Sequence, residues 1–296
     1  MTNIDQRLGS ILEAERLTEQ SPEMKPIRTE RDRVKSLLTD AFGAGGVSMR
    51  DGGSKAKNTM LKREHDLDLL YYVHAENDRV GGTLKDIYHN VLGVLADHYD
   101  FTPGTTAVRL FAKGCTRSGP GLRIDVVAGR FVEGASGDVF LHQADGEKSR
   151  LLTNPDVHIA HVRDFHSHEA VCAAKLWRVA NGVLVKQFAF ELLCIDLLEE
   201  SRSLGLSDQL ASLLKKIASL KSAPAIKDPA NGNNDVSKLL TGAAWADLKA
   251  AADHSVSMFS SCNWEEIIPP AVDSVKASAV ARASISVGSG TRPWGF

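Results

Sequence analysis

The sequence predicts an α/β (α+β) protein in which a mixed α/β half is followed by a helical half. Four apolar or alternating runs between about Asp66 and His142 are typical of strands. From about Phe165 onward, apolar residues recur at steps of three and four, which is typical of amphipathic helices. With 296 residues, of which 43% are hydrophobic and 24% charged, the chain can build a core in each half.

Two N-terminal helices are expected first, because "IDQRLGSILEAERL" and "TERDRVKSLLTDAF" both repeat apolar residues at helical spacing. The run Gly43–Gly46 interrupts this pattern. Next comes a series of strands, with one helix at about Leu84–Tyr99 between the first two of them. The strand candidates are Asp66–Val73, Thr106–Ala112, Leu122–Ala128 and Val139–His142.

The second half begins with "HEAVCAAKLWRVA" and "KQFAFELLCIDLLEE" and continues with two further helical runs. The intervening Ala223–Asp235 is rich in Pro, Gly and Asn and is expected to be an irregular loop. We expect a first lobe at residues 1–160 that includes the N-terminal helices, a helical lobe at 161–282, and a mobile tail at 283–296. A cleft between two such lobes is a common place for a ligand.

Charge and composition exclude several classes of protein. The net charge of −2 disfavours an extended nucleic-acid-binding surface, since such a surface usually carries a basic excess. No stretch is long and apolar enough for a membrane span. The first thirty residues are charged and lack the apolar core of a signal peptide, so we expect a cytoplasmic protein. The four cysteines show no metal-binding spacing.

Three aspartates interrupt apolar strands. Asp66 and Asp68 alternate with leucines, so both point to one face of their strand, and Asp125 repeats this context in "LRIDVVAG". A buried carboxylate needs a partner, which can be an arginine, a hydrogen-bond network or a metal ion. The alternative is that Asp66 and Asp68 have no functional role and are ordinary acids on the solvent face of an edge strand.

If the two strands are neighbours, the three carboxylates converge and repel one another. Divalent cations relieve such repulsion, and Mg²⁺ prefers carboxylate oxygens together with water and substrate phosphates. Two such ions are a known apparatus for in-line phosphoryl or nucleotidyl transfer. Upstream, Gly53 and Ser54 form a short turn whose N–H groups and hydroxyl can hold phosphate. The turn is not a P-loop, because the chain contains no Gly-Lys pair.

The order of these features resembles the polymerase-β-like nucleotidyltransferases: a Gly-Ser turn, a strand with Asp-x-Asp, and a third Asp on a later strand. Two downstream stretches, "CAAKLWRVANGVLVKQFAFELLCIDLL" and "IKDPANGNNDVSKLLTGAAWADLKAAA", narrow the match. They look like the helical-lobe segments of the oligoadenylate synthase and cGAS/DncV-like group. The combination resembles the CD-NTases of bacterial CBASS antiphage systems over about residues 50–255.

The resemblance implies a palm lobe with a mixed sheet and a C-terminal helical lobe that enclose a nucleoside triphosphate. Carried over position by position, Gly53 and Ser54 would hold the triphosphate. Asp66, Asp68 and Asp125 would be the catalytic residues and would bind Mg²⁺, with Mn²⁺ as an alternative ion.

On the helical side, the resemblance implies that Lys175 contacts the terminal phosphates. Asn233 and Asn234 are candidates for base contacts, with plain turn residues as the alternative. Where relatives often have Ser-Tyr, this chain has Gln187 and Phe188. Phe188 can still stack on a base, but the hydroxyl contacts are lost, so base preference does not carry over.

Lys55 and Lys57 flank the Gly-Ser turn and could add positive charge near phosphate, although we expect solvated loop lysines there. The stretch "HIAHVRDFHSH" contains four histidines but no accompanying cysteine cluster, so packing and capping are favoured over zinc. His65 is expected to tune local charge or to pack.

The favoured hypothesis is an enzyme that condenses nucleoside triphosphates, ATP and/or GTP, into a cyclic di- or trinucleotide for antiphage signalling through a downstream effector. One alternative is a template-independent transferase that extends an RNA end, as CCA-adding relatives do. Another is a degenerate protein that only binds nucleotide. The resemblance also implies a ubiquitin-conjugation-like partner at the C-terminal tail, because such proteins link similar enzymes through their C-termini in some antiphage operons. A disordered tail is the alternative. The tail here ends in Phe296 and not in glycine, which argues against direct conjugation.

Overall fold

The computed structural model describes residues 3–114, 123–144, 149–259 and 264–269. They form two compact units. The sheet unit comprises the described residues of 17–60 and 65–159. The helical unit comprises residues 3–16, 61–64 and the described residues from 160 onward. The predicted tail at 283–296 lies outside the described residues.

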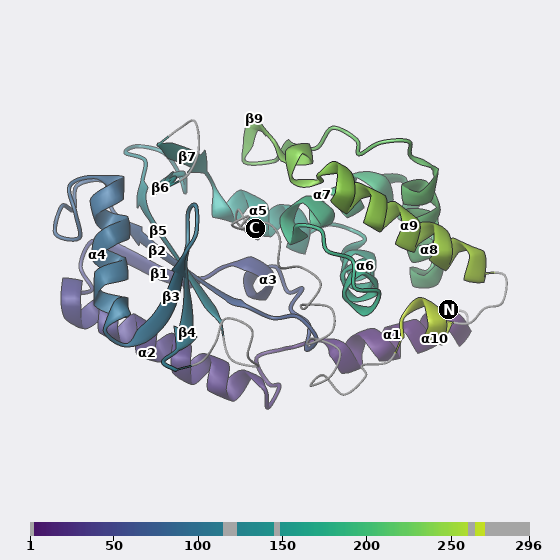
Figure 1. Cartoon of the computed structure of the whole chain (residues 1–296), viewed down its shortest axis with the longest axis horizontal. Coiled ribbons are helices and arrows are strands. Elements are labelled where there is room, and N and C mark those ends of the chain that lie inside the picture. The colour runs from purple at the N-terminus through teal and green to yellow at the C-terminus, as the bar shows by residue number, and fades with distance from the viewer. Residues whose placement is uncertain (1–2, 115–122, 145–148, 260–263, 270–296) are drawn as a thin grey trace. The chain divides into compact units, whose positions relative to one another are not determined.

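In the sheet unit, seven strands of the described residues form one mixed sheet (Figure 1). The order is β1-β2-β5-β4-β3, and β6 joins β5 to β7. Strands β2 and β5 are parallel, and each other strand pair within this sheet is antiparallel. The strands are β1 (Val47–Asp51), β2 (Leu67–Val73), β3 (Tyr99–Pro103), β4 (Val108–Ala112), β5 (Ile124–Phe131), β6 (Val139–His142) and β7 (Arg150–Thr153).

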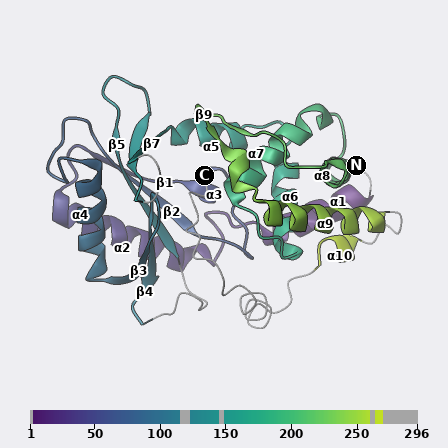
Figure 2. The ribbon, with the colours of Figure 1, turned by 45° about the horizontal axis from the view of Figure 1, so that its top comes forward.

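Helices α2 (Met24–Phe42) and α4 (Leu84–Ala96) cover one face of this sheet (Figures 1 and 2). Alternate residues of β2 and β5 point into the core that the two helices close, because side chains alternate along a strand. The core residues of these two strands are Leu67, Leu69, Tyr71, Val73, Ile124, Val126 and Ala128. Asp68 and Asp125 fall at the intervening positions and therefore lie on the other face of the sheet.

Helix α4 begins where the sequence predicts, because Thr83 and Asp86 form a capping box. The Thr83 Oγ1 atom accepts a hydrogen bond from the Asp86 N–H at 3.1 Å, and the Asp86 carboxylate accepts one from the Thr83 N–H at 3.0 Å. The helix ends at Ala96 and not at Tyr99 as predicted, because Tyr99 is buried as the first residue of β3.

Two short helices complete the sheet unit. Helix α3 (Gly53–Ala56) packs against β2. Helix α5 (Pro155–Arg163) follows β7 and crosses the boundary between the units at Ile159.

The helical unit contains α1 (Asn3–Glu15) together with the elements after α5. In it, α8 packs against α9, α6, α7 and α1. Its remaining elements are α6 (His168–Ala180), α7 (Gln187–Leu198), η1 (Glu199–Ser201), α8 (Leu206–Ser219), β8 (Lys227–Asp228), β9 (Asn231–Asp235), η2 (Val236–Leu239), α9 (Gly242–Met258) and α10 (Trp264–Ile267).

The placement of α1 differs from the sequence-based division, which put both N-terminal helices with the sheet. The buried Asp5 carboxylate accepts hydrogen bonds from the Ser207 N–H at 2.8 Å and the Ser207 hydroxyl at 2.6 Å. These bonds satisfy donors in the first turn of α8. The charge of Asp5 therefore joins α1 to the helical unit.

The expectation of an irregular loop at Ala223–Asp235 is wrong in part, because β8 and β9 form a small antiparallel hairpin there. The buried Asp228 closes it: its carboxylate accepts hydrogen bonds from the Ala230 N–H at 2.8 Å and from Asn234 Nδ2 at 2.9 Å. An Asp side chain that bonds to nearby N–H groups favours a turn, which here connects two strands. No helix in the described part of the chain is long and apolar enough to span a membrane.

Gly93 lies on the exposed side of α4, and a Cβ added there would meet nothing within 4 Å. We expect Gly93→Ala to stabilise the protein by about 0.5–1 kcal/mol, because glycine in a helix interior loses more conformational entropy on folding than alanine. Urea unfolding followed by circular dichroism measures this change. A lower free energy of unfolding than in the wild type would contradict the exposed helical position.

Candidate active site

Asp68 and Asp125 are register partners on the parallel strands β2 and β5. Neighbouring strands of a sheet lie about 4.8 Å apart, and paired residues point to the same face. Asp66 stands two residues before Asp68, immediately before β2 begins at Leu67. The structure thus brings together the three carboxylates in the sheet unit, on the face opposite the apolar core. The reading as acids of an edge strand is wrong, because β2 lies between β1 and β5.

An arginine is the main partner of these acids. Arg109 on β4 is the register partner of Asp125, and its Nε donates a hydrogen bond to Asp125 Oδ1 at 2.7 Å. Its Nη2 donates to Asp125 Oδ2, and the same nitrogen lies 3.6 Å from Asp66 Oδ2. Arg123 Nη1 lies 4.0 Å from the other Asp66 oxygen. Such a two-point pair between a guanidinium and a carboxylate is strong and directional.

Sequence reasoning left Arg109 without a role. One feature of the sequence could have indicated such a role: Arg109 is a cationic residue between apolar neighbours in the predicted strand Thr106–Ala112. Knowing that this residue meets Asp125 requires the β4–β5 register, which the strand pattern alone does not contain.

Asp68 is the most perturbed acid of the three. Burial raises its pKa well above the ordinary value, and the negative charges of Asp125 and Asp66 raise it further. The positive charges of Lys57 and Arg109 act in the opposite direction. The protonated form of Asp68 is therefore favoured far more than that of an exposed aspartate.

Neither lysine near the turn is a solvated loop residue, which corrects the sequence-based expectation. Lys57 has no exposed surface, and its charge acts on Asp68. Lys55 Nζ lies 2.6 Å from Asp51 Oδ2 and 2.9 Å from Glu19 Oε1. Lys55 thus links α3 to the end of β1.

The Gly-Ser turn lies directly against Asp68. Gly52 N–H donates to the Asp68 carbonyl at 2.8 Å, and Gly53 adopts a φ of 52° in the left-handed region. A Cβ at position 53 would stand 1.6 Å from Asp68 Oδ2. Only glycine permits this approach, since it has no Cβ and tolerates positive φ. Ser54 is buried beside it.

These residues fit a magnesium ion that shares its ligands with a substrate. Mg²⁺ is usually held by one or two carboxylates plus substrate phosphates. Asp68 and Asp125 provide two paired carboxylates on the same face of the sheet, next to the Gly-Ser turn. Among the described residues, no three His, Cys, Asp or Glu side chains form a ready-made cage for a metal. Both oxygens of Asp125 accept hydrogen bonds from Arg109.

The remaining predicted residues lie in the helical unit. Lys175 is 2% exposed, and its Nζ donates to Glu191 Oε1 at 2.7 Å. Phe188 is also buried, at the start of α7. The alternative that Lys175 is a solvated helix lysine is therefore wrong. Its predicted phosphate contact and the predicted stacking of Phe188 stay predictions.

Asn233 and Asn234 lie on β9. Asn233 is exposed, and its N–H donates a hydrogen bond to Asn231 Oδ1 at 3.2 Å. The Asn234 side chain donates to Asp228 and so supports the hairpin. Their predicted base contacts stay predictions.

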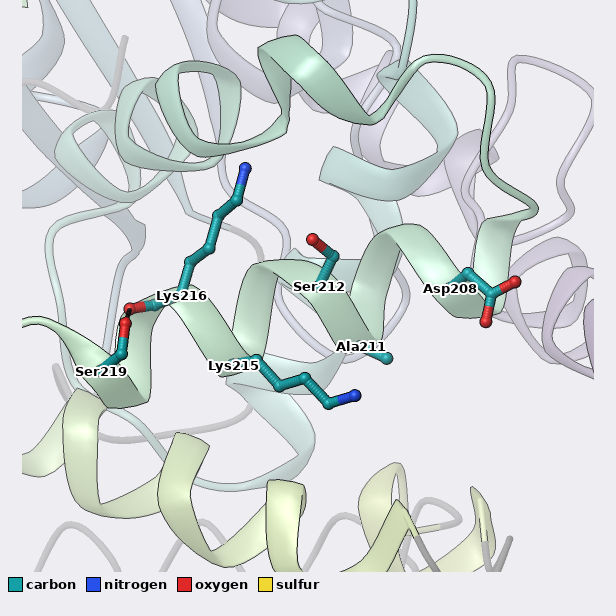
Figure 3. A pocket seen from close by; sticks show the side chains of 6 residues that line it. All are labelled: Asp208, Ala211, Ser212, Lys215, Lys216 and Ser219. Atoms are coloured by element: carbon teal, nitrogen blue, oxygen red, sulfur yellow. Dashed lines mark hydrogen bonds between the residues drawn. The ribbon is translucent and has the colours of Figure 1, made fainter.

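A shallow hollow lies along one side of α8 (Figure 3). None of the residues that line it was predicted as a site residue. In Figure 3, Lys216 points away from Lys215, and its Nζ donates to the Leu197 carbonyl at 2.6 Å. Lys216 therefore fastens α8 to α7. The residues that line the hollow are Asp208, Ala211, Ser212, Lys215, Lys216 and Ser219.

No protein-family model and no curated protein matches the sequence. Solved structures do. CdnC of E. coli MS115-1, determined with ATP, is 18% identical, with 90% of this chain and 98% of CdnC covered and a TM-score of 0.63. The Cid1 poly(U) polymerase with MgGTP is 11% identical, with 91% and 99% covered and a TM-score of 0.63.

The chain has the polymerase-β-like nucleotidyltransferase fold. A third structural neighbour is the CdnE cyclic dinucleotide synthase of Elizabethkingia meningoseptica with GTP and Apcpp. It is 12% identical, with 78% of this chain and 91% of CdnE covered and a TM-score of 0.55. The predicted fold class is thereby confirmed, and the likeness to CdnC and CdnE agrees with the resemblance found in the sequence.

We expect Gly53→Ala to destabilise the nucleotidyltransferase fold by about 1–2 kcal/mol, the cost of the left-handed region for a residue with a Cβ. The new Cβ must also displace the Asp68 carboxylate. Urea unfolding of Gly53→Ala and the matched control Gly93→Ala measures the difference. Equal stability of Gly53→Ala and the wild type would show that the turn does not lie against Asp68.

Proposed function

We propose that the chain is a Mg²⁺-dependent nucleotidyltransferase that condenses nucleoside triphosphates, ATP and/or GTP, into a cyclic di- or trinucleotide. The observation that carries the proposal is the register pairing of Asp68 with Asp125 beside the bare backbone of Gly53. The sequence resemblance to the CD-NTases and the likeness of the fold to CdnC and CdnE support it. Mn²⁺ is the alternative ion.

In the proposed reaction, a ribose hydroxyl oxygen attacks the α-phosphorus of a triphosphate. A new P–O bond forms, the bond to the β-phosphate breaks, and pyrophosphate leaves with the electron pair. The hydroxyl proton passes to a base. A later transfer of the same kind closes the ring.

The other residues of the sheet unit bind and orient. Gly53 and Ser54 are proposed to hold the triphosphate through the backbone N–H groups of the turn and the Ser54 hydroxyl. Asp66, Asp68 and Asp125 would hold Mg²⁺, which when bound supplies Lewis-acid stabilisation of the phosphate charge.

Lys175, Phe188, Asn233 and Asn234 are proposed as further nucleotide contacts. For Lys175, a phosphate contact requires the ammonium to exchange part of its bond to Glu191. Of the four, Asn233 is the most exposed. The sequence resemblance to the CD-NTases extends the proposal to a product that acts on a downstream effector in antiphage defence.

Extension of an RNA end is the second candidate, and the Cid1 poly(U) polymerase fold is the observation that favours it. The net charge of −2 disfavours it, since a polynucleotide substrate is usually met by a basic surface. Reactions with all four triphosphates and Mg²⁺, with and without added RNA, separate the two. Phosphatase-resistant cyclic products without RNA support the cyclic synthase, whereas nucleotide added only to RNA supports the transferase.

We expect Asp68→Asn to lower the rate of product formation by about a hundredfold or more, as is typical when a charge that stabilises the transition state is removed. Mass spectrometry of the products measures the rate. Asp253→Asn is the matched control, because Asp253 has 61% of its side chain exposed on α9 and should leave the rate unchanged. Equal rates for Asp68→Asn and the wild type would instead favour a protein that only binds nucleotide.

A further inference from the structure

Arg109 holds Asp125 from the neighbouring strand by both oxygens. The two residues face each other in the antiparallel β4–β5 register, so the backbone presents the guanidinium to the carboxylate without a long reach. Burial by itself would lower the pKa of Arg109, but the hydrogen bonds to Asp125 and the nearby carboxylates raise it. The guanidinium is therefore charged at any pH at which the protein is folded.

Among the described residues, three cations act on the three acids. Arg109 reaches both Asp125 and Asp66, and Arg123 stands 4.0 Å from Asp66. The buried Lys57 acts on Asp68. These three cations therefore offset much of the negative charge of the acids.

We expect a free divalent cation to bind this cluster with low affinity. At Asp125 it competes with a guanidinium that already donates a hydrogen bond to each oxygen, and the two positive charges repel at close range. Mg²⁺ also gives up its water reluctantly. A triphosphate changes this balance, because it brings several negative charges and oxygen ligands of its own.

We propose that Arg109 is a built-in counter-ion of Asp125 that keeps the affinity of the acid cluster for a free divalent cation low and makes cation binding depend on the triphosphate. The inference rests on the metal-binding part of the proposed function. Because linkage is reciprocal, the cation and the triphosphate then strengthen each other's binding by the same factor.

Titration calorimetry with Mn²⁺, with and without a non-hydrolysable ATP analogue, tests this on the full chain. For the wild type we expect a Kd for Mn²⁺ at least about tenfold lower with the analogue than without it. For Arg109→Gln we expect Mn²⁺ alone to bind about tenfold more tightly than to the wild type, because one positive charge beside the ligands is gone. The gain from the analogue should shrink accordingly.

Two further variants keep the test sharp. Arg163→Gln makes the same change of charge at a side chain that is 50% exposed in the helical unit, and it should leave both Kd values unchanged. Arg109→Lys keeps the charge but cannot bond both oxygens at once, so its Kd for Mn²⁺ alone should lie between those of the wild type and Arg109→Gln. If Arg109→Gln does not fold in EDTA by circular dichroism, the lysine variant decides.

The outcomes separate this inference from the proposed function. If the wild type binds Mn²⁺ in the presence of the analogue but both Arg109 variants match its Kd for Mn²⁺ alone, the counter-ion inference is wrong and the proposed function stands. Tight binding of Mn²⁺ to the wild type without the analogue also overturns the inference alone. If the wild type binds no Mn²⁺ even with the analogue, the proposed metal site and the inference both fail.

Discussion

The parallel pairing of β2 with β5 is the constraint on which the rest of the structure depends. It places one set of alternating residues in the core under α2 and α4 and the other set, which includes Asp68 and Asp125, on the opposite face. A slip of one residue in this register would bury a carboxylate among leucines and move a leucine to the acid cluster. The burial of the apolar face therefore also aligns the two acids, and the chemistry proposed for the site needs no separate device to bring them together.

The acid cluster shows how far an electrostatic argument from sequence can go. Mutual repulsion of three carboxylates is a sound reason to expect compensating charge, but it does not say which charge. The sequence favours divalent cations as the compensating charge, whereas in the structure arginine and lysine supply much of it.

Elements with a strong local pattern were predictable from the sequence. The strand of Asp-x-Asp and the strand Val139–His142 were found within a residue, and the capping box defined the start of α4. The missed strands, such as β1 and β7, are short and partly exposed, so neither contains a long buried apolar run. Arg109, Lys57 and the placement of α1 depend on pairings between distant segments, which local pattern does not encode. The approach of Gly53 to Asp68 likewise becomes visible only in three dimensions.

That approach also has a consequence for how such a site can diverge. Positions 53 and 68 share one small volume, so they cannot vary independently. A descendant that acquired any larger residue at position 53 would have to move or shorten the acid at position 68, and would lose the alignment of that acid with Asp125. Substitutions at positions 53 and 68 should therefore occur together. A relative in which only the glycine is replaced should be one in which the carboxylate at position 68 is no longer needed.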